Sequence, residues 1–563
     1  SPIRQACYEV NAPAELPLRS IVLKSEIPGT VSRVETALPD GRLQYQWTVK
    51  DVPQAFREPA MPSLHTVMQR LLISTVPSWK DISQWYWKLC EPRLALTPDM
   101  KAKVAELVRG ESESAGKIQA IFRFVSQEIR YMGLTLETEA PGYEPHDVSQ
   151  TFENRHGVCR DKAALLAALL REAGLDAYPV LFYVGPKKDH EVPQPFFNHA
   201  VTAVRKADGQ YLLMDSTDEH TKDLFPSYLA DMSYLVAHPD GEPLQTSPGS
   251  PYTENLARIK TSGKIAANGD FTCESRIQLQ GINDNAYRSM LLRRTPPERE
   301  LFFATALKGL VPGAELHRLE IQPADLQDTS RQLELNLSFS APDILIRNDD
   351  TAMLRLPRLS AVIGYVNFAL EQAGLEKRRF PFKTQVACGV MEEGSYELDS
   401  AWGQALSLPK FTQIDNDCLR WQRELKFIRG VLSFSNEFSL KTVEFSPAQY
   451  LELKQVLRSI EANNRKRPIF ACLTDASEAP PPSPAELVDA ADAVVLSDTW
   501  DYELEDAQNW TLVRKVKKKI LTYNGLKNNS ELKFDYNPAW EEVRLDSASV
   551  RSVSSIQTLR RSS

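Results

Sequence analysis

The spacing of apolar and polar residues changes several times along the chain of 563 residues. Alternation of the two kinds, as over 43–47 (L-Q-Y-Q-W), predicts strands from residue 1 to about 75. Helical spacing follows between about 78 and 129, and alternation returns from about 256 to 445. Further helices are predicted at 297–308, 359–373 and 448–460. The pattern therefore predicts an α+β chain with a helical part between β-rich regions.

The last part of the chain is set apart by a proline-rich segment, 478–484 (E-A-P-P-P-S-P). Such a segment is stiff and extended, as in a linker. Strands are predicted beyond it, at 493–496, 513–523 and 540–545. These strands form either a small β-domain of their own or part of another domain.

One helix is predicted to begin at Cys159, where the polar residues 155–157 give way to an apolar run. Ala163, Leu166 and Leu170 recur there at helical spacing. The first turn of a helix has unpaired N–H groups and the positive end of the helix dipole, and both favour a thiolate. Cys159 is therefore a candidate nucleophile. The alternative is a buried cysteine that packs as a small hydrophobe.

Two later segments supply candidate partners for this cysteine. His199 lies near the start of a predicted strand, 196–204, and Asp215 lies near the end of the next, 210–217. An Asp-Gly turn at 208–209 joins them, so the strands are expected to pair as a hairpin and bring His199 and Asp215 together. Cysteine, histidine and aspartate then follow the order nucleophile, base and orienting acid. The alternatives are a histidine satisfied within a sheet and an aspartate that caps a strand.

These motifs resemble the transglutaminase-like superfamily. The resemblance is carried by G-x-C-x-D-K-A over 157–163, N-H-A over 198–200, D-S-T over 215–217 and I-R-Y over 129–131. It covers about 115–245 and implies a papain-like cysteine fold. Val158 departs from the pattern, because many relatives carry Asp before the cysteine.

The flanking regions are similar to the β-rich domains that precede and follow such cores in bacteria. The fold expected is α+β, with a papain-like transglutaminase core flanked by antiparallel β-sandwich-like domains. The strands beyond the linker resemble the opening part of the preceding domain, so the tail is expected to pack with the N-terminal segment. A circular permutation, a piece of a tandem array or an imposed order of segments would each explain this order. The expected parts are a partial N-terminal β-domain (1–75), the helical connection and core (76–245), a β-rich region (250–460), a linker (461–487) and the β-rich tail (488–563).

Composition and motifs limit which binding partners, cofactors and locations are expected. The net charge of −8 gives no electrostatic reason to expect nucleic acid, and the basic run at 514–519 suits a solvated strand edge. Seven scattered cysteines without a CxxC pair argue against a zinc site and a dense disulfide framework. No dinucleotide, P-loop or HExxH motif is present, so no cofactor or metal is expected. No apolar run reaches transmembrane length, and the resemblance favours a periplasmic or extracellular location.

The resemblance and the three residues together predict a cysteine acyl-transfer enzyme that acts on amide bonds of peptides or proteins. It would be a protease or amidase, or an amine transferase, with Cys159, His199 and Asp215 as its triad. The Cys159 backbone N–H and one further donor would hold the oxyanion, and Tyr131, Gln150 and Asn154 are the candidates for that donor. Asp161 and Lys162 are expected to serve structure. The alternative is a non-catalytic binding or scaffold protein with a vestigial core.

Overall fold

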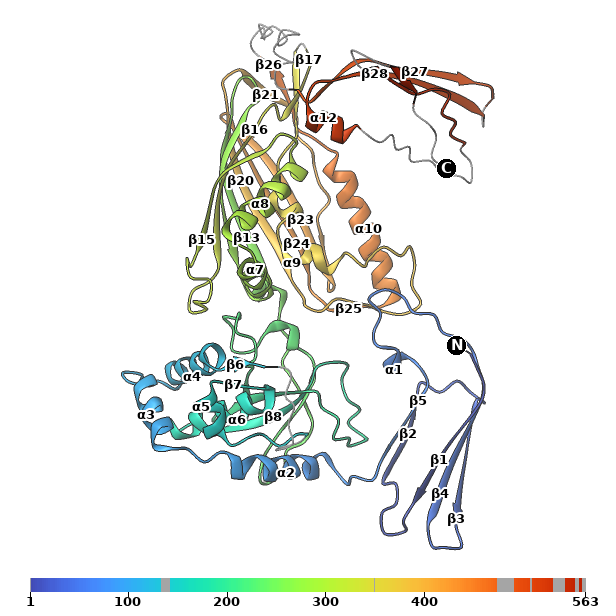
Figure 1. The fold of residues 1–563 in the computed structure, drawn as a ribbon, viewed down its shortest axis with the longest axis vertical. Helices are drawn as coiled ribbons and strands as arrows, with labels where there is room; N and C mark the ends of the chain where they lie inside the picture. The colour runs from blue at the N-terminus through green and yellow to red at the C-terminus, as the bar shows by residue number, and fades with distance from the viewer. Residues whose placement is uncertain are drawn as a thin grey trace. The chain divides into compact units, whose positions relative to one another are not determined.

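The computed structural model describes most of the chain, and it has an α+β fold as predicted (Figure 1). It divides into two compact units, 1–473 and 474–563, and each is described here by itself. The described residues are 2–132, 142–348, 350–472, 491–506, 509–529, 542–551 and 556–558.

The first unit opens with the strands that alternation predicted. β1 (Ile3–Ala12), β4 (Leu43–Val52) and β3 (Val31–Ala37) form an antiparallel sheet in the order β1-β4-β3. β2 (Ser20–Lys24) pairs with β5 (Arg70–Ser74), and the short helix α1 (Leu64–Val67) lies between β4 and β5 along the chain. The hydrophobic core of this part is a small cluster of Ala12, Tyr45 and Trp47, and most of β1 is exposed.

A helical connection follows, and its caps explain where the helices begin. Ser78 accepts a hydrogen bond from the Asp81 N–H, and Thr97 accepts one from the Met100 N–H. The connection comprises α2 (Trp79–Cys90), the 3-10 turn η1 (Glu91–Arg93), α3 (Pro98–Leu107), α4 (Ser114–Arg123) and η2 (Phe124–Glu128). η2 is a π-helical turn, so the predicted helix through residue 129 widens in its last turn.

The next part of the unit packs one buried helix on an antiparallel sheet. The helix α6 (Cys159–Glu172) has a wholly buried centre and contacts strands β8 and β9. The Thr202 hydroxyl ties β9 to α6 by donating to the Ala163 carbonyl at 2.9 Å. The sheet order is β10-β9-β8-β11-β12. Its strands are β8 (Ala177–Tyr183), β9 (His199–Arg205), β10 (Tyr211–Met214), β11 (Ser233–Val236) and β12 (Gln245–Thr246).

The predicted hairpin between β9 and β10 is confirmed, with both strands shorter than expected, since β10 spans Tyr211–Met214 and not 210–217. β9 begins at His199 rather than at residue 196, and Tyr211 pairs with Arg205. Gly209 turns the chain with a φ of 82°, a conformation that glycine adopts without strain.

The rest of the first unit is built on an eight-stranded sheet in the order β15-β16-β14-β13-β20-β24-β23-β22. All neighbouring strands in this sheet pair antiparallel, except β13 and β20, which pair in parallel. Helices α7 to α10 cover one of its faces (Figure 1). The strands are β13 (Leu256–Ile265), β14 (Phe271–Leu279), β15 (Glu315–Gln322), β16 (Glu334–Ala341), β20 (Gly389–Leu398), β22 (Ile414–Asp415), β23 (Leu419–Ile428) and β24 (Val431–Leu440).

The helices on this sheet match the predicted stretches with one difference. They are α7 (Ile282–Leu292), α8 (Pro296–Leu310), α9 (Tyr365–Ala369) and α10 (Pro447–Asn464). The helix predicted at 359–373 is split into the 3-10 turn η5 (Leu359–Ala361) and α9. The cause is Gly364, whose φ of 114° is incompatible with a continuous helix.

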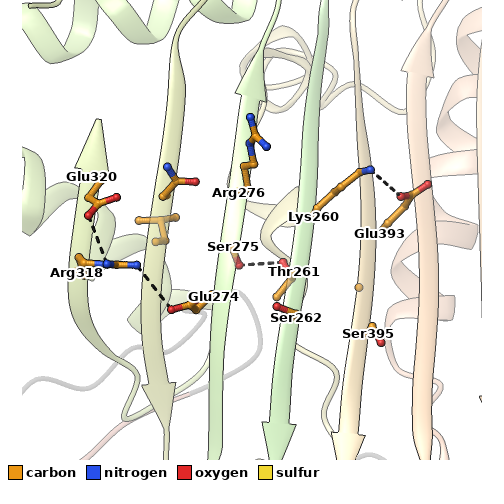
Figure 2. Close-up of a pocket in the computed structure, with 13 residues that line it drawn as sticks. Lys260, Thr261, Ser262, Glu274, Ser275, Arg276, Arg318, Glu320, Glu393 and Ser395 are labelled. Carbon is orange, nitrogen blue, oxygen red and sulfur yellow. Dashed lines mark hydrogen bonds and ion pairs between the residues drawn. The ribbon is translucent and has the colours of Figure 1, made fainter. Parts of the chain in front are cut away.

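The opposite face of the eight-stranded sheet is polar and its charges are paired. Figure 2 shows Lys260 beside Glu393, and Arg318 between Glu274 and Glu320. A hollow of about 470 Å³ lies on this face. Its lining contains no cysteine or histidine, and its charged side chains are paired.

The expected linker at 461–487 is corrected at its start. Residues 461–464 complete α10, and β26 (Ile469–Cys472) lies between β18 (Thr351–Leu354) and β21 (Trp402–Ser407) in a four-stranded sheet that β17 (Leu345–Asn348) completes. Burial of Phe470 explains why this segment is ordered structure and not linker. Residues 473–487, with the proline-rich segment, lie outside the described residues.

The second unit contains a two-stranded hairpin of β27 (Ala493–Leu504) and β28 (Trp510–Ile520), followed by α12 (Tyr523–Asn528). The strand predicted at 513–523 stops at residue 520 because Thr522 caps α12 by accepting a hydrogen bond from the Gly525 N–H. The strand predicted at 540–545 is wrong for residues 542–545, which form no strand, and residues 540 and 541 lie outside the described part. β29 (Ser549–Arg551) pairs with β30 (Ile556–Thr558).

Candidate active site

Cys159 occupies the position that the sequence predicted, as the first residue of α6. The Asp161 carboxylate caps this helix, because its Oδ2 accepts a hydrogen bond from the Val158 N–H at 3.0 Å. Its Oδ1 accepts one from the His146 N–H, also at 3.0 Å. Asp161 is buried, and both of its carboxylate oxygens accept backbone hydrogen bonds. This agrees with the structural role expected of it. The chain at 146–147 is thereby fixed beside the start of α6.

Gly157 allows this cap to lie close to the backbone. A Cβ at position 157 would lie 2.8 Å from the Cβ of Asp161 and 3.1 Å from the Cγ2 of Thr151. The short strand β7 (His156–Gly157) also pairs in parallel with β6 (Arg130–Tyr131). Gly157 therefore holds two neighbours of the cysteine in place, Asp161 on one side and Tyr131 on the other.

Lys162 is buried and fixes the chain that leads to Tyr131. Its Nζ donates hydrogen bonds to the carbonyls of Ser126, at 3.2 Å, and Ile129. These carbonyls lie within and just after the π-helical turn, so the lysine closes the end of that helix. Burial lowers the pKa of Lys162 to about 8. Its bonds to backbone carbonyls agree with the structural role expected of it.

His199 begins β9 and lies beside Asp215, which follows β10. Nε2 of His199 and Oδ2 of Asp215 are 2.9 Å apart. In the hairpin register Met214 is opposite Thr202, so Asp215 falls opposite Val201, two residues from His199 and on the same face. The alternation of the two strands therefore produces this contact.

Asp215 is held rigidly toward the histidine. Its Oδ1 accepts hydrogen bonds from the Thr217 N–H at 2.8 Å and the Thr217 hydroxyl at 2.7 Å, which leaves Oδ2 for the ring. Burial would raise the pKa of Asp215, but the bonds and charge from His199 and the bonds from Thr217 outweigh burial and lower it. Asp215 is therefore an anion at neutral pH.

The Cys159 side chain lies near enough to the same imidazole to contribute to raising its pKa. Because Asp215 takes Nε2, the other ring nitrogen, Nδ1, is left for the thiol. Burial would lower the pKa of His199, but the hydrogen bond to Asp215, the nearby Cys159 and the negative charges of both residues raise it to about 10. The structure thus brings the three predicted residues together in the order Cys159, His199, Asp215, and the geometry suits transfer of the thiol proton to the ring.

The three candidate oxyanion donors lie in different surroundings. Gln150 and Asn154 are exposed on α5 (Val148–Asn154). Tyr131 is also exposed, at 40%, but partial burial of its hydroxyl and then the negative charges of Cys159 and Asp215 raise its pKa. The raised pKa of Tyr131 shows that its hydroxyl lies within reach of the charges of the site.

Sequence reasoning missed two residues around the cysteine. His146 donates to Asp161. Tyr86 of α2 is fully buried, and its pKa is raised by burial, then by Cys90 and to a smaller extent by the charge of Cys159. Neither residue stands in a motif, since one lies in a loop and the other on an apolar helix face. Only the folded chain brings them to residues 159–161.

A comparison with known families decides the nature of this part of the chain. The model of the transglutaminase-like superfamily matches residues 101–216. These residues form a transglutaminase-like core. The resemblance predicted over about 115–245 is thereby confirmed, and the transglutaminase-like core supports a cysteine enzyme as the general type of protein.

Solved structures add to this at the level of fold. A candidate protease from Parabacteroides distasonis is 14% identical with a TM-score of 0.53, and the match covers 84% of this chain and 73% of that one. A candidate cysteine protease from Cytophaga hutchinsonii is also 14% identical, with a TM-score of 0.18 over 40% of this chain and 73% of that one. The first likeness shows that the fold extends well beyond the transglutaminase-like core. No curated protein matches the chain. Within the described part of the chain, no helix has the length and apolar character needed to span a membrane.

Proposed function

We propose that the chain is a cysteine acyl-transfer enzyme that acts on amide bonds of peptides or proteins. The observation that carries this proposal is the bond between His199 and Asp215 at 2.9 Å, with Cys159 nearby at the start of a buried helix. A histidine with a purely structural role in the sheet would not need both a thiol and a carboxylate beside its ring. A thiol on one side of the ring and a buried anion on the other suit nucleophilic catalysis.

The proton of the Cys159 thiol moves to His199 before the attack, a transfer that the raised His199 pKa of about 10 favours. His199 accepts it through Nδ1, and the resulting imidazolium is stabilised by the carboxylate of Asp215 at Nε2. The thiolate attacks the amide carbonyl and forms a tetrahedral intermediate. His199 then returns the proton to the leaving amine or ammonia, and a thioester is left on Cys159.

The negative oxygen of the intermediate needs two donors. As the first residue of α6, Cys159 has a backbone N–H without a partner inside the helix, and that group is the first donor. We assign the Tyr131 hydroxyl as the second. Its support is the strand pairing with Gly157 and the effect of the Cys159 charge on its pKa. Loss of one such donor typically costs about 3 to 4 kcal/mol of transition-state stabilisation.

The thioester is resolved by water or by an amine. Water gives hydrolysis, as in a protease or amidase, and an amine gives transfer. Both outcomes use the same three residues, because His199 activates the incoming water or amine as it activated the thiol. A periplasmic or extracellular location stays a prediction.

Thiol reactivity tests this function without knowledge of the substrate. Iodoacetamide labelling near pH 6 is followed peptide by peptide by mass spectrometry, with the exposed Cys7 as the reference thiol in the same sample. Cys159 is expected to react much faster than Cys7 because His199 holds its proton. An ordinary thiol, with a pKa of about 8.5, is less than about 1% ionised at this pH. The His199→Ala variant should therefore lose about a hundredfold in rate at Cys159.

Analysis of the reaction products distinguishes hydrolysis, amine transfer and the absence of catalysis. The protein is incubated with a peptide mixture and a primary amine, and new N-termini are counted against amine adducts. New N-termini support hydrolysis, adducts support transfer, and both must vanish in Cys159→Ser. If Cys159 labels no faster than Cys7 and no product forms, the chain is a non-catalytic binding or scaffold protein with a vestigial core.

A further inference from the structure

A hollow of about 440 Å³ lies beside the transglutaminase-like core residues already described. Its apolar lining comes from α2, from residue 143 and from the loop before β9. We call it the aromatic pocket, and its apolar lining residues are Val76, Ile82, Trp85, Tyr143, Pro195 and Phe196. Volumes of this order are typical of ligand sites in proteins.

Hydrogen bonds of Tyr143 link the aromatic pocket to the segment that leads to His199. The Tyr143 hydroxyl donates to the Phe197 carbonyl and accepts from the Phe197 N–H, both at 3.0 Å. Phe197 stands two residues before His199, and the pocket residue Phe196 stands three before it. Because an extended chain advances at most about 3.6 Å per residue, the Cα of Phe196 is within about 11 Å of the Cα of His199.

The other side of the pocket leads to the cysteine. The residue after Tyr143 is Glu144, whose carbonyl accepts a hydrogen bond from Nε of Arg160 at 2.8 Å. Arg160 directly follows Cys159. The wall of the pocket is therefore bonded both to the strand that begins at the base and to the helix that begins at the nucleophile.

Two of the lining aromatics are unusually exposed on rigid supports. Phe196 is 67% exposed and Trp85 is 39% exposed. The loop that carries Phe196 is fixed, since the Ser74 hydroxyl donates to the Pro193 carbonyl at 2.5 Å and the Trp79 indole donates to the His190 carbonyl at 2.8 Å. Exposed apolar rings on a fixed scaffold beside a cleft are typical of binding surfaces.

We propose that the aromatic pocket binds an apolar side chain of the substrate, preferably an aromatic one, within three residues of the amide that Cys159 attacks. This inference rests on the proposed function. Trp85 and Tyr143 meet edge to face, with centroids 5.7 Å apart and planes at 77°, an arrangement into which a further ring can stack. Asp81 also lines the pocket, and its carboxylate disfavours acidic side chains.

Two series of alkylating peptides test the pocket on both sides of the attacked bond. Acetylated tripeptide chloromethyl ketones extend toward the acyl side, and N-chloroacetyl tripeptide amides extend toward the leaving group. In each series one Phe or one Asp is moved through an otherwise all-glycine peptide. The rate of Cys159 alkylation is divided by the iodoacetamide rate of the same protein, so that changes in the thiol itself cancel.

The expected result is one position in one series where Phe raises this ratio by about tenfold over glycine, and where Asp does not. In Trp85→Ala and Phe196→Ala the gain should fall to about twofold or less. Phe368→Ala, which alters an exposed phenylalanine of α9, is the matched control and should keep the full gain.

Each negative result of this experiment leads to a different conclusion. Rapid iodoacetamide labelling of Cys159 with no preference for Phe in either series overturns the pocket and leaves the proposed function standing. A preference for Phe that survives in both pocket variants also overturns it, because another surface then recognises the ring. Labelling of Cys159 no faster than Cys7 removes the proposed function and this inference with it.

Discussion

His199 and Asp215 are joined through Nε2 and Oδ2 at 2.9 Å, while Thr217 occupies the other carboxylate oxygen. The carboxylate therefore faces the imidazole with one dedicated oxygen. Its negative charge, together with that of Cys159, raises the pKa of His199 to about 10 in spite of burial. The protonation state of His199 is consequently a sensitive measure of the whole group of three residues.

Asp215→Asn should lower the pKa of His199. The amide keeps the size of the side chain and removes its charge, and an opposite charge at this distance is typically worth about one to three pKa units. Nuclear magnetic resonance of proteins with ¹³C-labelled histidine measures the titration. Asp240→Asn, beside His238, is the control that should leave His199 unaffected. An unchanged His199 titration in Asp215→Asn would show that the carboxylate does not act on the ring.

The raised pKa of His199 also predicts how stability depends on pH. The ordinary histidine pKa is about 6.5, so charged His199 stabilises the folded protein. This stabilisation is complete below about pH 6.5 and is lost as the pH rises through about 10. Chemical unfolding at pH 7 and pH 10 should show a smaller difference in His199→Gln than in the wild type. An equal difference in the two proteins would contradict the assignment.

Gly157→Ala should damage the site through the helix cap. The new methyl group would lie 2.8 Å from the Cβ of Asp161, so the carboxylate that caps Val158 must move. We expect a loss of about 1 to 3 kcal/mol in the free energy of unfolding and slower alkylation of Cys159. At Gly249 no atom lies within 4 Å of an added Cβ, so Gly249→Ala is the matched control. If both variants unfold like the wild type, the close approach at Gly157 has no energetic consequence.

The exposed aromatic residues of the hairpin in the second unit support a prediction about the tail. Trp500, Tyr502, Leu504 and Trp510 are exposed on this hairpin, and a two-stranded hairpin alone is marginally stable in water. We still expect the tail to pack with the N-terminal strands, within one chain or between copies. Deletion of residues 486–563 should then destabilise residues 1–75 and promote aggregation. Full solubility and an unchanged melting transition in the truncated protein would show that the tail is an independent module.

The sequence predicted those parts of the fold that depend on neighbouring residues. The start of α6 at Cys159, the hairpin of β9 and β10 and the helix α10 follow from periodicity, turns and caps, and all are present. The split at Gly364 was missed because one glycine within an apolar pattern does not reveal its φ. The start of the linker was misplaced because the burial of Phe470 depends on strands far away in the chain.

The candidate site also contains some residues that the sequence predicted and others that it did not. Cys159, His199 and Asp215 could be found because each stands in a short motif at a predictable end of a helix or strand. The aromatic pocket could not, since Trp85, Tyr143 and Phe196 are separated by more than fifty residues at each step and no periodicity links them. Its walls meet only through tertiary contacts such as the two hydrogen bonds between Tyr143 and Phe197.

Lys162 gives a last prediction, in which stability and activity should change together. Replacement by alanine removes the donor to the carbonyls of Ser126 and Ile129, and buried carbonyls without a partner typically cost about 1 to 3 kcal/mol each. Lys162→Ala should therefore lower the melting temperature and, by releasing Tyr131, reduce turnover. Lys101→Met, at an exposed lysine of α3, is the control that should change neither.

The pH dependence of the free energy of unfolding tests whether the buried amine of Lys162 accounts for its effect on stability. Burial lowers its pKa from 10.5 to about 8, so the charged form costs free energy in the folded protein below about pH 8. This cost disappears between about pH 8 and 10.5, where the unfolded chain binds the proton and the folded chain does not. Wild type should thus gain up to about 3 kcal/mol of stability relative to Lys162→Met over this interval, as measured by denaturant unfolding. Turnover abolished in Lys162→Ala at an unchanged melting temperature would instead assign the lysine to the chemistry.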